Sequence, residues 1–272
     1  MNKAIQVAVA AALLSAGAVN NSVSAEELPE SARPVPQGTA GGHWYDRHLA
    51  KVAEAQAGGA DVVFVGDSLT EFWETNGSDQ WKKHFDTGAF KSMNLGFAGD
   101  RTEHVLWRLD NGELDGFAAK AVILEIGTNN SDAGGGRTWE QINPTNTFVG
   151  VKAIIAKMRE KQPSAKLIVH AIFPREWNPS SECRKRNEEV NALVKDYIST
   201  SGVANVVWCN FNDKLRAPAV QAPSGSDLVQ TGNFCNDGPI HLASKGYEVW
   251  GQAVLPLIND LLRPQFNDKR IK

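Results

Sequence analysis

The chain has 272 residues, of which 42% are hydrophobic, and its net charge is −3. This is the composition of a folded globular protein. Because its 28 basic residues are outnumbered by 31 acidic ones, the sequence argues against nucleic-acid binding through bulk positive charge. A chain of this length forms one large domain or two small ones, with a core that needs no metal or disulfide bond.

The first 25 residues have the pattern of a secretory signal peptide. Lys3 supplies a positive charge, residues 4–19 are mostly small and apolar, and Val23-Ser24-Ala25 fits the small-x-small cleavage pattern. The apolar run is shorter than the roughly 20 residues of a membrane span, so an uncleaved anchor is the less favoured alternative. We expect cleavage after Ala25 and a periplasmic or secreted protein with no stable membrane anchor.

The remaining sequence divides into a leader and a single domain. Residues 26–42 are rich in Pro, Gly and acidic residues and are expected to be a leader. From residue 43 to 272, apolar runs of strand length alternate with helical stretches, which predicts a three-layer α/β/α, flavodoxin-like sandwich around a five-stranded parallel sheet. The expected strands are 61–65, 90–95, 121–126, 166–172 and 203–208, and the expected helices are 45–57, 101–110, 146–161, 184–200 and 243–263. Residues 209–241 are expected to form surface loops.

The chain contains three cysteines, Cys183, Cys209 and Cys235. None of them has the spacing of a zinc site or of a Cys-x-x-Cys pair. In an oxidising compartment one pair could form a disulfide bond, and all three pairings remain open. Ordinary buried cysteines are the alternative.

Polar and glycine residues follow the expected strands directly, at the sheet edge where open parallel sheets bind ligands. Ser68 follows the first strand, and a serine there is either a helix N-cap or a nucleophile. Gly99 offers a backbone N–H that can approach a ligand closely, and Asn129 offers a side-chain amide. Both are donors of the kind that stabilise an oxyanion. Late in the chain, His241 lies close to Asp237.

These segments resemble the conserved blocks of the SGNH hydrolases, also called the GDSL esterase/lipase family. Residues 65–69 (VGDSL) are similar to block I, residues 94–100 (NLGFAGD) to block II, and residues 127–130 (GTNN) to block III. Asp237 with His241 is similar to block V. One such tetrapeptide would be weak support, but four blocks in order, each after a strand or before the last helix, make the resemblance specific.

The resemblance extends to a subgroup of the family. Residues 99–109 (GDRTEHVLWRL) and 111–114 (NGEL) are similar to the catalytic subunits of platelet-activating-factor acetylhydrolase and to related bacterial acetylesterases. Those subunits form dimers, so the resemblance permits a homodimer. It also implies an enzyme that needs neither a metal ion nor a cofactor.

The resemblance implies a role for each matching residue. Ser68 would be the nucleophile, His241 the general base and Asp237 the acid that orients it. The oxyanion hole would be formed by the N–H groups of Ser68 and Gly99 and by the Asn129 side chain. The candidates for contact with the substrate are Asp67, Arg101, Asn130, Trp73 and Trp177. Asp67 is also expected to position the Ser68 turn. The rings of Trp73 and Trp177 could stack on a sugar.

Three further residues leave alternatives open. The family has Asp-x-x-His, whereas this chain has one more residue between Asp237 and His241, so a backbone carbonyl is the alternative partner for the imidazole. His170 lies inside an apolar strand and is expected to be a core histidine. His104 either lines the site or covers it.

The expected function is that of an exported serine esterase that removes short acyl groups, most of all acetyl, from a small-molecule or glycan ester. A lysophospholipase or lipid acetylhydrolase is the alternative. A non-catalytic carbohydrate-binding module is a third hypothesis, supported only by the unusual spacing of Asp237 and His241.

Overall fold

The computed structural model describes residues 28–133, 137–138, 142–216, 232–235 and 239–262. The expected signal peptide and Asp237 lie outside these residues. At the centre is a five-stranded parallel sheet with the order β2-β1-β3-β4-β5, which confirms the predicted fold class. The strands are β1 (Val62–Gly66), β2 (Ser92–Gly96), β3 (Ala121–Glu125), β4 (Lys166–His170) and β5 (Val206–Cys209).

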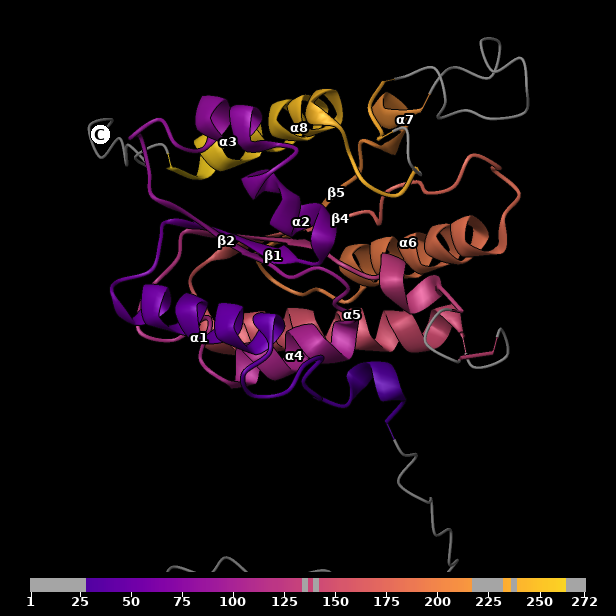
Figure 1. Cartoon of the computed structure of the whole chain (residues 1–272), viewed down its shortest axis with the longest axis horizontal. Coiled ribbons are helices and arrows are strands. Elements are labelled where there is room, and N and C mark those ends of the chain that lie inside the picture. Colours follow the sequence, from indigo (N-terminus) through magenta and orange to yellow (C-terminus); the bar gives the residue numbers. More distant parts are fainter. Residues whose placement is uncertain (1–27, 134–136, 139–141, 217–231, 236–238, 263–272) are drawn as a thin grey trace, which may run out of the picture.

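Helices cover both faces of the sheet, as Figure 1 shows. One face carries α1 (His43–Gln56), α4 (Thr102–Asp110), α5 (Pro144–Lys161) and α6 (Glu182–Thr200). The other carries α2 (Ser68–Glu71), α3 (Ser78–His84) and α8 (Ser244–Leu262). The short helix α7 (Asn212–Leu215) lies beyond β5, and the 3-10 helices are η1 (Glu30–Ala32), η2 (Phe72–Glu74) and η3 (Thr128–Ser131).

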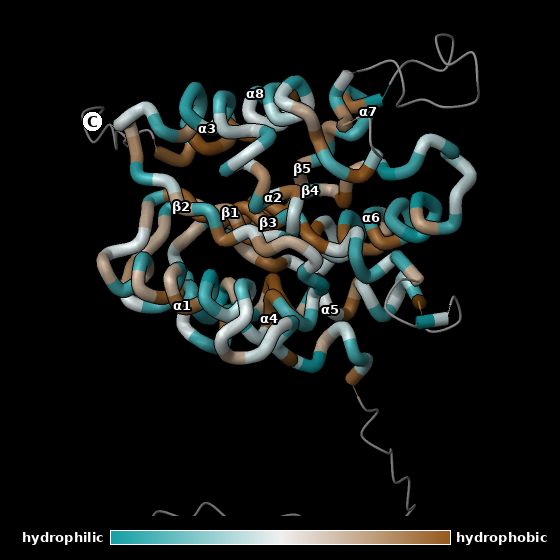
Figure 2. Tube along the Cα trace, viewed as in Figure 1, coloured by the Kyte–Doolittle hydropathy of each residue, from teal (hydrophilic) through white to brown (hydrophobic). Residues whose placement is uncertain are grey.

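The strands consist mostly of apolar residues because each face of the sheet is buried under a separate core. Val63 and Val65 of β1 point into the core beneath α4, α5 and α6. Val62 and Phe64 alternate with them and enter an aromatic-rich core beneath α3 and α8. Figure 2 shows the same arrangement as a hydrophobic middle layer between helices whose outer sides are hydrophilic.

The sequence-based boundaries differ from the structure mainly at short elements. Helix α3 was not expected, and Ser68 opens a helix of only four residues. Strands β4 and β5 are shorter than predicted, because β4 ends at His170 and β5 begins at Val206. In the described part of the chain, no helix has the length and apolar character needed to cross a membrane.

The described part of the expected leader is packed on the domain. Ser31 and Ala32 are buried where η1 contacts α4 and α5. Thr102 Oγ1 donates a hydrogen bond of 2.8 Å to the Ser31 carbonyl, and the Val35 N–H donates one of 3.2 Å to the Glu103 carbonyl. This segment therefore buttresses the start of α4, which follows the loop of Gly99.

Neither Cys183 nor Cys209 forms a disulfide bond in the structure. Cys183 and Cys209 are buried, so for these two the interpretation as ordinary buried cysteines holds. Cys235 is half-buried and its Sγ lies 3.4 Å from the Leu242 carbonyl oxygen.

Candidate active site

The turn that presents Ser68 is a tight connection between β1 and α2. Asp67 is the N-cap of α2, and its Oδ1 accepts a hydrogen bond of 3.0 Å from the Leu69 N–H. A Cβ at Gly66 would lie 2.2 Å from the Glu125 carbonyl oxygen, so only glycine fits there. Because Asp67 has the capping role, the Ser68 hydroxyl is available for another contact.

That contact is with His241. Ser68 Oγ and His241 Nε2 are 3.1 Å apart, which is hydrogen-bond distance between a nucleophile and its general base. The histidine is placed by an antiparallel bridge between Phe234 and Leu242 and by the Cys235 N–H, which donates to the His241 carbonyl at 2.9 Å. The structure thus brings together two residues that are 173 positions apart in the chain.

The third expected member of the triad, Asp237, lies outside the described residues and stays a prediction. The nearest described residue on that side is Pro239, whose carbonyl accepts a hydrogen bond of 2.8 Å from the Glu176 N–H. Glu176 itself has a positive φ of 63°, which is uncommon for a residue with a side chain. This bond joins the loop after β4 to the segment that precedes His241.

Two of the expected oxyanion donors lie in the segments that directly follow β2 and β3, the strands on either side of β1. Gly99, in the loop after β2, has a φ of 79°, which favours glycine. Asn129, in η3 after β3, donates through Nδ2 to the Asp100 carbonyl at 2.8 Å and lies 3.4 Å from Asp67 Oδ2. The Asn129 amide therefore connects the residue next to Gly99 with the residue next to Ser68, so the expected donors share one corner of the sheet edge.

A buried network of ion pairs and hydrogen bonds, centred on Arg108, connects the loops that form this corner. Arg108 of α4 is fully buried, and its Nε donates to Asp100 Oδ2 at 2.7 Å while Nη1 bonds Glu113. Its Nη2 reaches the Gly66 carbonyl at 3.3 Å, and its guanidinium lies 3.9 Å from the centroid of the Phe97 ring. One side chain thus ties the nucleophile turn to the Gly99 loop. The spacing of these residues in the sequence gives no sign of this role.

A pair of buried carboxyl groups lies behind the nucleophile turn. Asp67 and Glu125 are both fully buried, and Glu125 ends β3 beside Gly66. Burial raises the pKa of Asp67 to about 7, and the nearby Asp100 adds to this effect. Burial and the charge of Asp67 raise the pKa of Glu125 well above its usual range. Burial therefore favours the neutral form of Glu125, which its position in an apolar strand did not indicate.

Three of the residues expected to contact substrate have structural roles instead. Trp73 is fully buried in the aromatic core, with its ring 4.6 Å from that of Tyr247, so its predicted stacking on a sugar is wrong. Asn130 is buried and its Oδ1 accepts a hydrogen bond of 3.0 Å from the Thr102 N–H. Asp67 is buried as the cap of α2, which confirms its positioning role but removes it from contact with substrate.

The other two candidates lie nearer the surface. Arg101 is the N-cap residue of α4. Its side chain is 22% exposed and forms ion pairs with Glu103 and Glu30. Trp177 is half-buried against the aromatic-rich core. Neither has a contact that links it to Ser68.

His170 and His104, the two other histidines considered from the sequence, both accept hydrogen bonds that hold them away from the nucleophile. His170 is buried, and its Nε2 accepts a hydrogen bond of 3.1 Å from Trp250 Nε1, which confirms its prediction as a core residue. His104 accepts a hydrogen bond of 3.0 Å from the Arg101 N–H, so it caps α4. Burial lowers the pKa of both histidines to about 3, and neither is suited to act as a base at neutral pH. In the described residues no group of three or more His, Cys, Asp or Glu side chains is arranged to hold a metal ion.

A serine hydrogen-bonded to a histidine, at the carboxyl edge of a parallel sheet and beside expected oxyanion donors, defines a serine hydrolase. The GDSL-like lipase/acylhydrolase family model matches residues 64–249. The chain belongs to this family, and it is a hydrolase of carboxylic esters.

Individual relatives and solved structures agree with this assignment. The chain is 37% identical over 174 residues to the human platelet-activating factor acetylhydrolase IB subunit alpha1, covering 64% of this chain and 69% of the relative. A putative acylhydrolase from Bacteroides fragilis has a TM-score of 0.61 at 21% identity, with 80% of this chain and 97% of that chain covered. The acetylxylan esterase Axe2 from Geobacillus stearothermophilus has a TM-score of 0.55 at 14% identity, with coverages of 74% and 94%.

Proposed function

We propose that this protein is an exported serine esterase that removes short acyl groups, above all acetyl, from carbohydrate esters. The single observation that carries the catalytic part is the 3.1 Å contact between Ser68 Oγ and His241 Nε2. The proposed triad is Ser68, His241 and Asp237, with Asp237 holding the imidazole in the required tautomer.

In the proposed reaction His241 Nε2 takes the hydroxyl proton of Ser68 as Oγ attacks the carbonyl carbon of the ester. The negative charge that develops on the carbonyl oxygen is stabilised by the Ser68 and Gly99 N–H groups and the Asn129 amide. The carbon–oxygen bond to the alcohol then breaks, and the alcohol leaves with the proton from His241. A water molecule, deprotonated by His241, attacks the acyl-enzyme, and Ser68 regains its proton as the carboxylic acid is released.

The acetyl preference is supported by the names of the relatives. A platelet-activating factor acetylhydrolase subunit and an acetylxylan esterase both act on acetyl groups, and they differ in the alcohol that carries the group. The proposal that the alcohol is a carbohydrate is supported by the likeness to the acetylxylan esterase and by the expected export of the protein. The identity of 37% to the acetylhydrolase subunit keeps a lipid acetyl ester as the second candidate.

The test compares the mature wild-type enzyme with Ser68→Ala, using Ser180→Ala, an exposed serine, as the control. We expect wild type and control to hydrolyse p-nitrophenyl acetate and to release acetate from acetylated xylan, with kcat/KM falling beyond four carbons. The Ser68→Ala variant should lose about 10⁶-fold in kcat. Efficient cleavage of a choline-headed acetyl lipid but not of acetylated xylan would favour the lipid candidate. No release from any ester would favour the non-catalytic module.

A further inference from the structure

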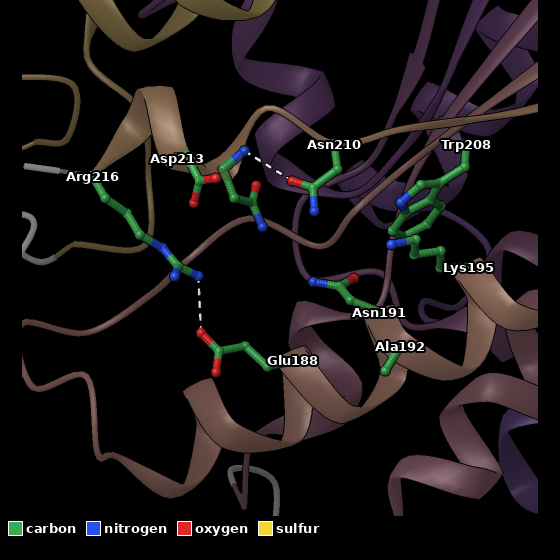
Figure 3. A pocket seen from close by; sticks show the side chains of 9 residues that line it. Glu188, Asn191, Ala192, Lys195, Trp208, Asn210, Asp213 and Arg216 are labelled. Carbon is green, nitrogen blue, oxygen red and sulfur yellow. Dashed lines mark hydrogen bonds and ion pairs between the residues drawn. The ribbon is translucent and has the colours of Figure 1, made fainter. Parts of the chain in front are cut away.

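A polar pocket lies at the same edge of the sheet as Ser68 but is separate from it. Its volume is about 300 Å³, and its lining comes from α6, the end of β5 and α7 (Figure 3). Three strand spacings of about 4.8 Å separate β1 from β5, so the pocket lies roughly 14 Å from the nucleophile along the edge. Its volume is at the lower end of the range for small-molecule sites.

The central part of the pocket is lined by carboxamide side chains. Asn191 and Asn212 both donate through Nδ2 to the Ile172 carbonyl, at 2.9 Å and 3.0 Å, which fixes the two amides relative to β4. Asn210 accepts a hydrogen bond of 3.0 Å from the Asn212 N–H through Oδ1, and its Nδ2 has no partner among the described residues. Asn191 Oδ1 accepts a hydrogen bond of 2.7 Å from the Ile172 N–H. Asn191 and Asn212 therefore each keep one Nδ2 hydrogen for a ligand's hydroxyl groups, and Asn210 keeps two.

The side-chain oxygen of Asn212 in this lining has no hydrogen-bond partner among the described residues. Asn212 is only 5% exposed, and its Oδ1 makes no hydrogen bond with any described residue. A buried carbonyl without a partner costs free energy, because it has given up its hydration. Asn212 belongs to the pocket lining, but this oxygen is itself buried, so a hydroxyl donor bound there satisfies it only if the lining shifts on binding.

The charges around the pocket balance one another. Arg216 and Glu188 form an ion pair of 2.9 Å at one end in Figure 3, while Lys195 lies beside Trp208 at the other end and Asp213 adds a second carboxylate. Two cations and two carboxylates give no net field to attract a phosphate or a cationic ligand. The half-buried indole of Trp208 adds an apolar surface with the flat shape that packs against the C–H face of a sugar ring.

We propose that this pocket is an accessory sugar-binding site, which holds a neutral pyranose unit of a glycan at a distance from the ester cleaved at Ser68. The inference rests on the proposed function for the identity of the glycan, but the binding step itself does not depend on catalysis. An oligosaccharide bound at both places would be anchored along the carboxyl edge of the sheet.

The experiment measures binding of xylotetraose, which carries no acetyl group, by isothermal titration calorimetry on the full mature chain. The pocket variant is Asn210→Ala, which removes from the exposed lining the amide whose Nδ2 is available to a ligand. The matched control is Asn259→Ala, which removes an exposed amide on α8 outside the pocket. We expect millimolar binding by wild type and control and about tenfold weaker binding by the pocket variant, with p-nitrophenyl acetate turnover unchanged in all three.

Equal affinity of the pocket variant and the control, or no binding by wild type up to about 10 mM, would overturn the inference. Tight binding of inorganic phosphate that competes with xylotetraose would also overturn it. The proposed function fails on a different result, namely no acetate release from acetylated glycans, and that result leaves a xylotetraose complex intact.

Discussion

At the scale of single residues, neighbouring amides at the end of β3 have opposite roles. The Asn129 side chain faces the corner that it shares with Ser68 and Gly99, whereas the Asn130 side chain is buried and bonds the start of α4. From the sequence, Asn129 was predicted to be an oxyanion donor and Asn130 to contact the substrate. The second prediction is wrong because a strand end shows which residues lie near the edge but not which way each side chain points.

This contrast leads to the first prediction. Asn129→Ala should lower kcat on p-nitrophenyl acetate by about 10²–10³-fold, because it removes a donor to the oxyanion. Asn130→Ala should instead lower the free energy of unfolding by about 1–3 kcal/mol, because it leaves buried partners unsatisfied. Kinetics and thermal melts of both variants check this, and an Asn129→Ala enzyme with wild-type kcat would exclude the amide from the oxyanion hole.

The second prediction concerns Asp237. If it orients His241, Asp237→Ala should lower kcat by about 10⁴-fold while KM changes little. Asp86→Ala, an exposed aspartate on another loop, is the control and should leave kcat unchanged. A near-normal kcat in Asp237→Ala would assign the imidazole to a different partner.

At the scale of elements, the active-site corner depends on contacts between segments whose individual sequences did not indicate those contacts. Apolar strands and long amphipathic helices were predictable because burial on both sheet faces leaves a periodic pattern. The four-residue helix α2 was too short to leave such a pattern. The ion network of Arg108 was not predictable, because it joins β1, the Gly99 loop and α4 only after folding.

The third prediction tests that network. Arg108→Met should reduce the free energy of unfolding by about 3–5 kcal/mol, because the Asp100 and Glu113 carboxylates would remain buried without their cation. Lys83→Met breaks the exposed pair with Glu248 and should cost about 1 kcal/mol or less. Urea unfolding measures both values, and equal losses would show that the buried network contributes no more than a surface pair.

At the scale of the whole molecule, the two buried carboxyls make stability depend on pH. The unfolded chain releases the Glu125 proton near a pKa of 4.5, but the folded protein keeps it to higher pH. Asp67 follows the same direction, with a folded pKa of about 7 against 3.8. Between the unfolded and the folded pKa of each carboxyl group, the folded state binds more protons than the unfolded state. The contribution of these groups to the free energy of unfolding is therefore complete at low pH and is lost as pH rises through that range.

The fourth prediction follows from this sign. The free energy of unfolding of wild type should contain a component that decreases from about pH 4.5 to pH 7, and Glu125→Gln should reduce that decrease because its amide does not titrate. Unfolding titrations at several pH values measure the slope, with Glu189→Gln, an exposed glutamate on α6, as the control. Identical slopes in Glu125→Gln and wild type would show that Glu125 carries its charge in the folded protein.

The contact between Ser68 and His241 has a consequence for how the protein acquires its activity. The nucleophile is in the first strand–helix connection, and its base comes directly before the last helix, 173 positions later. On the ribosome, the early strands emerge long before the base is synthesised, so esterase activity can appear only after nearly the whole domain has been translated. Turnover is therefore a reporter of chain completion, and an N-terminal fragment should gain activity only when a C-terminal fragment complements it.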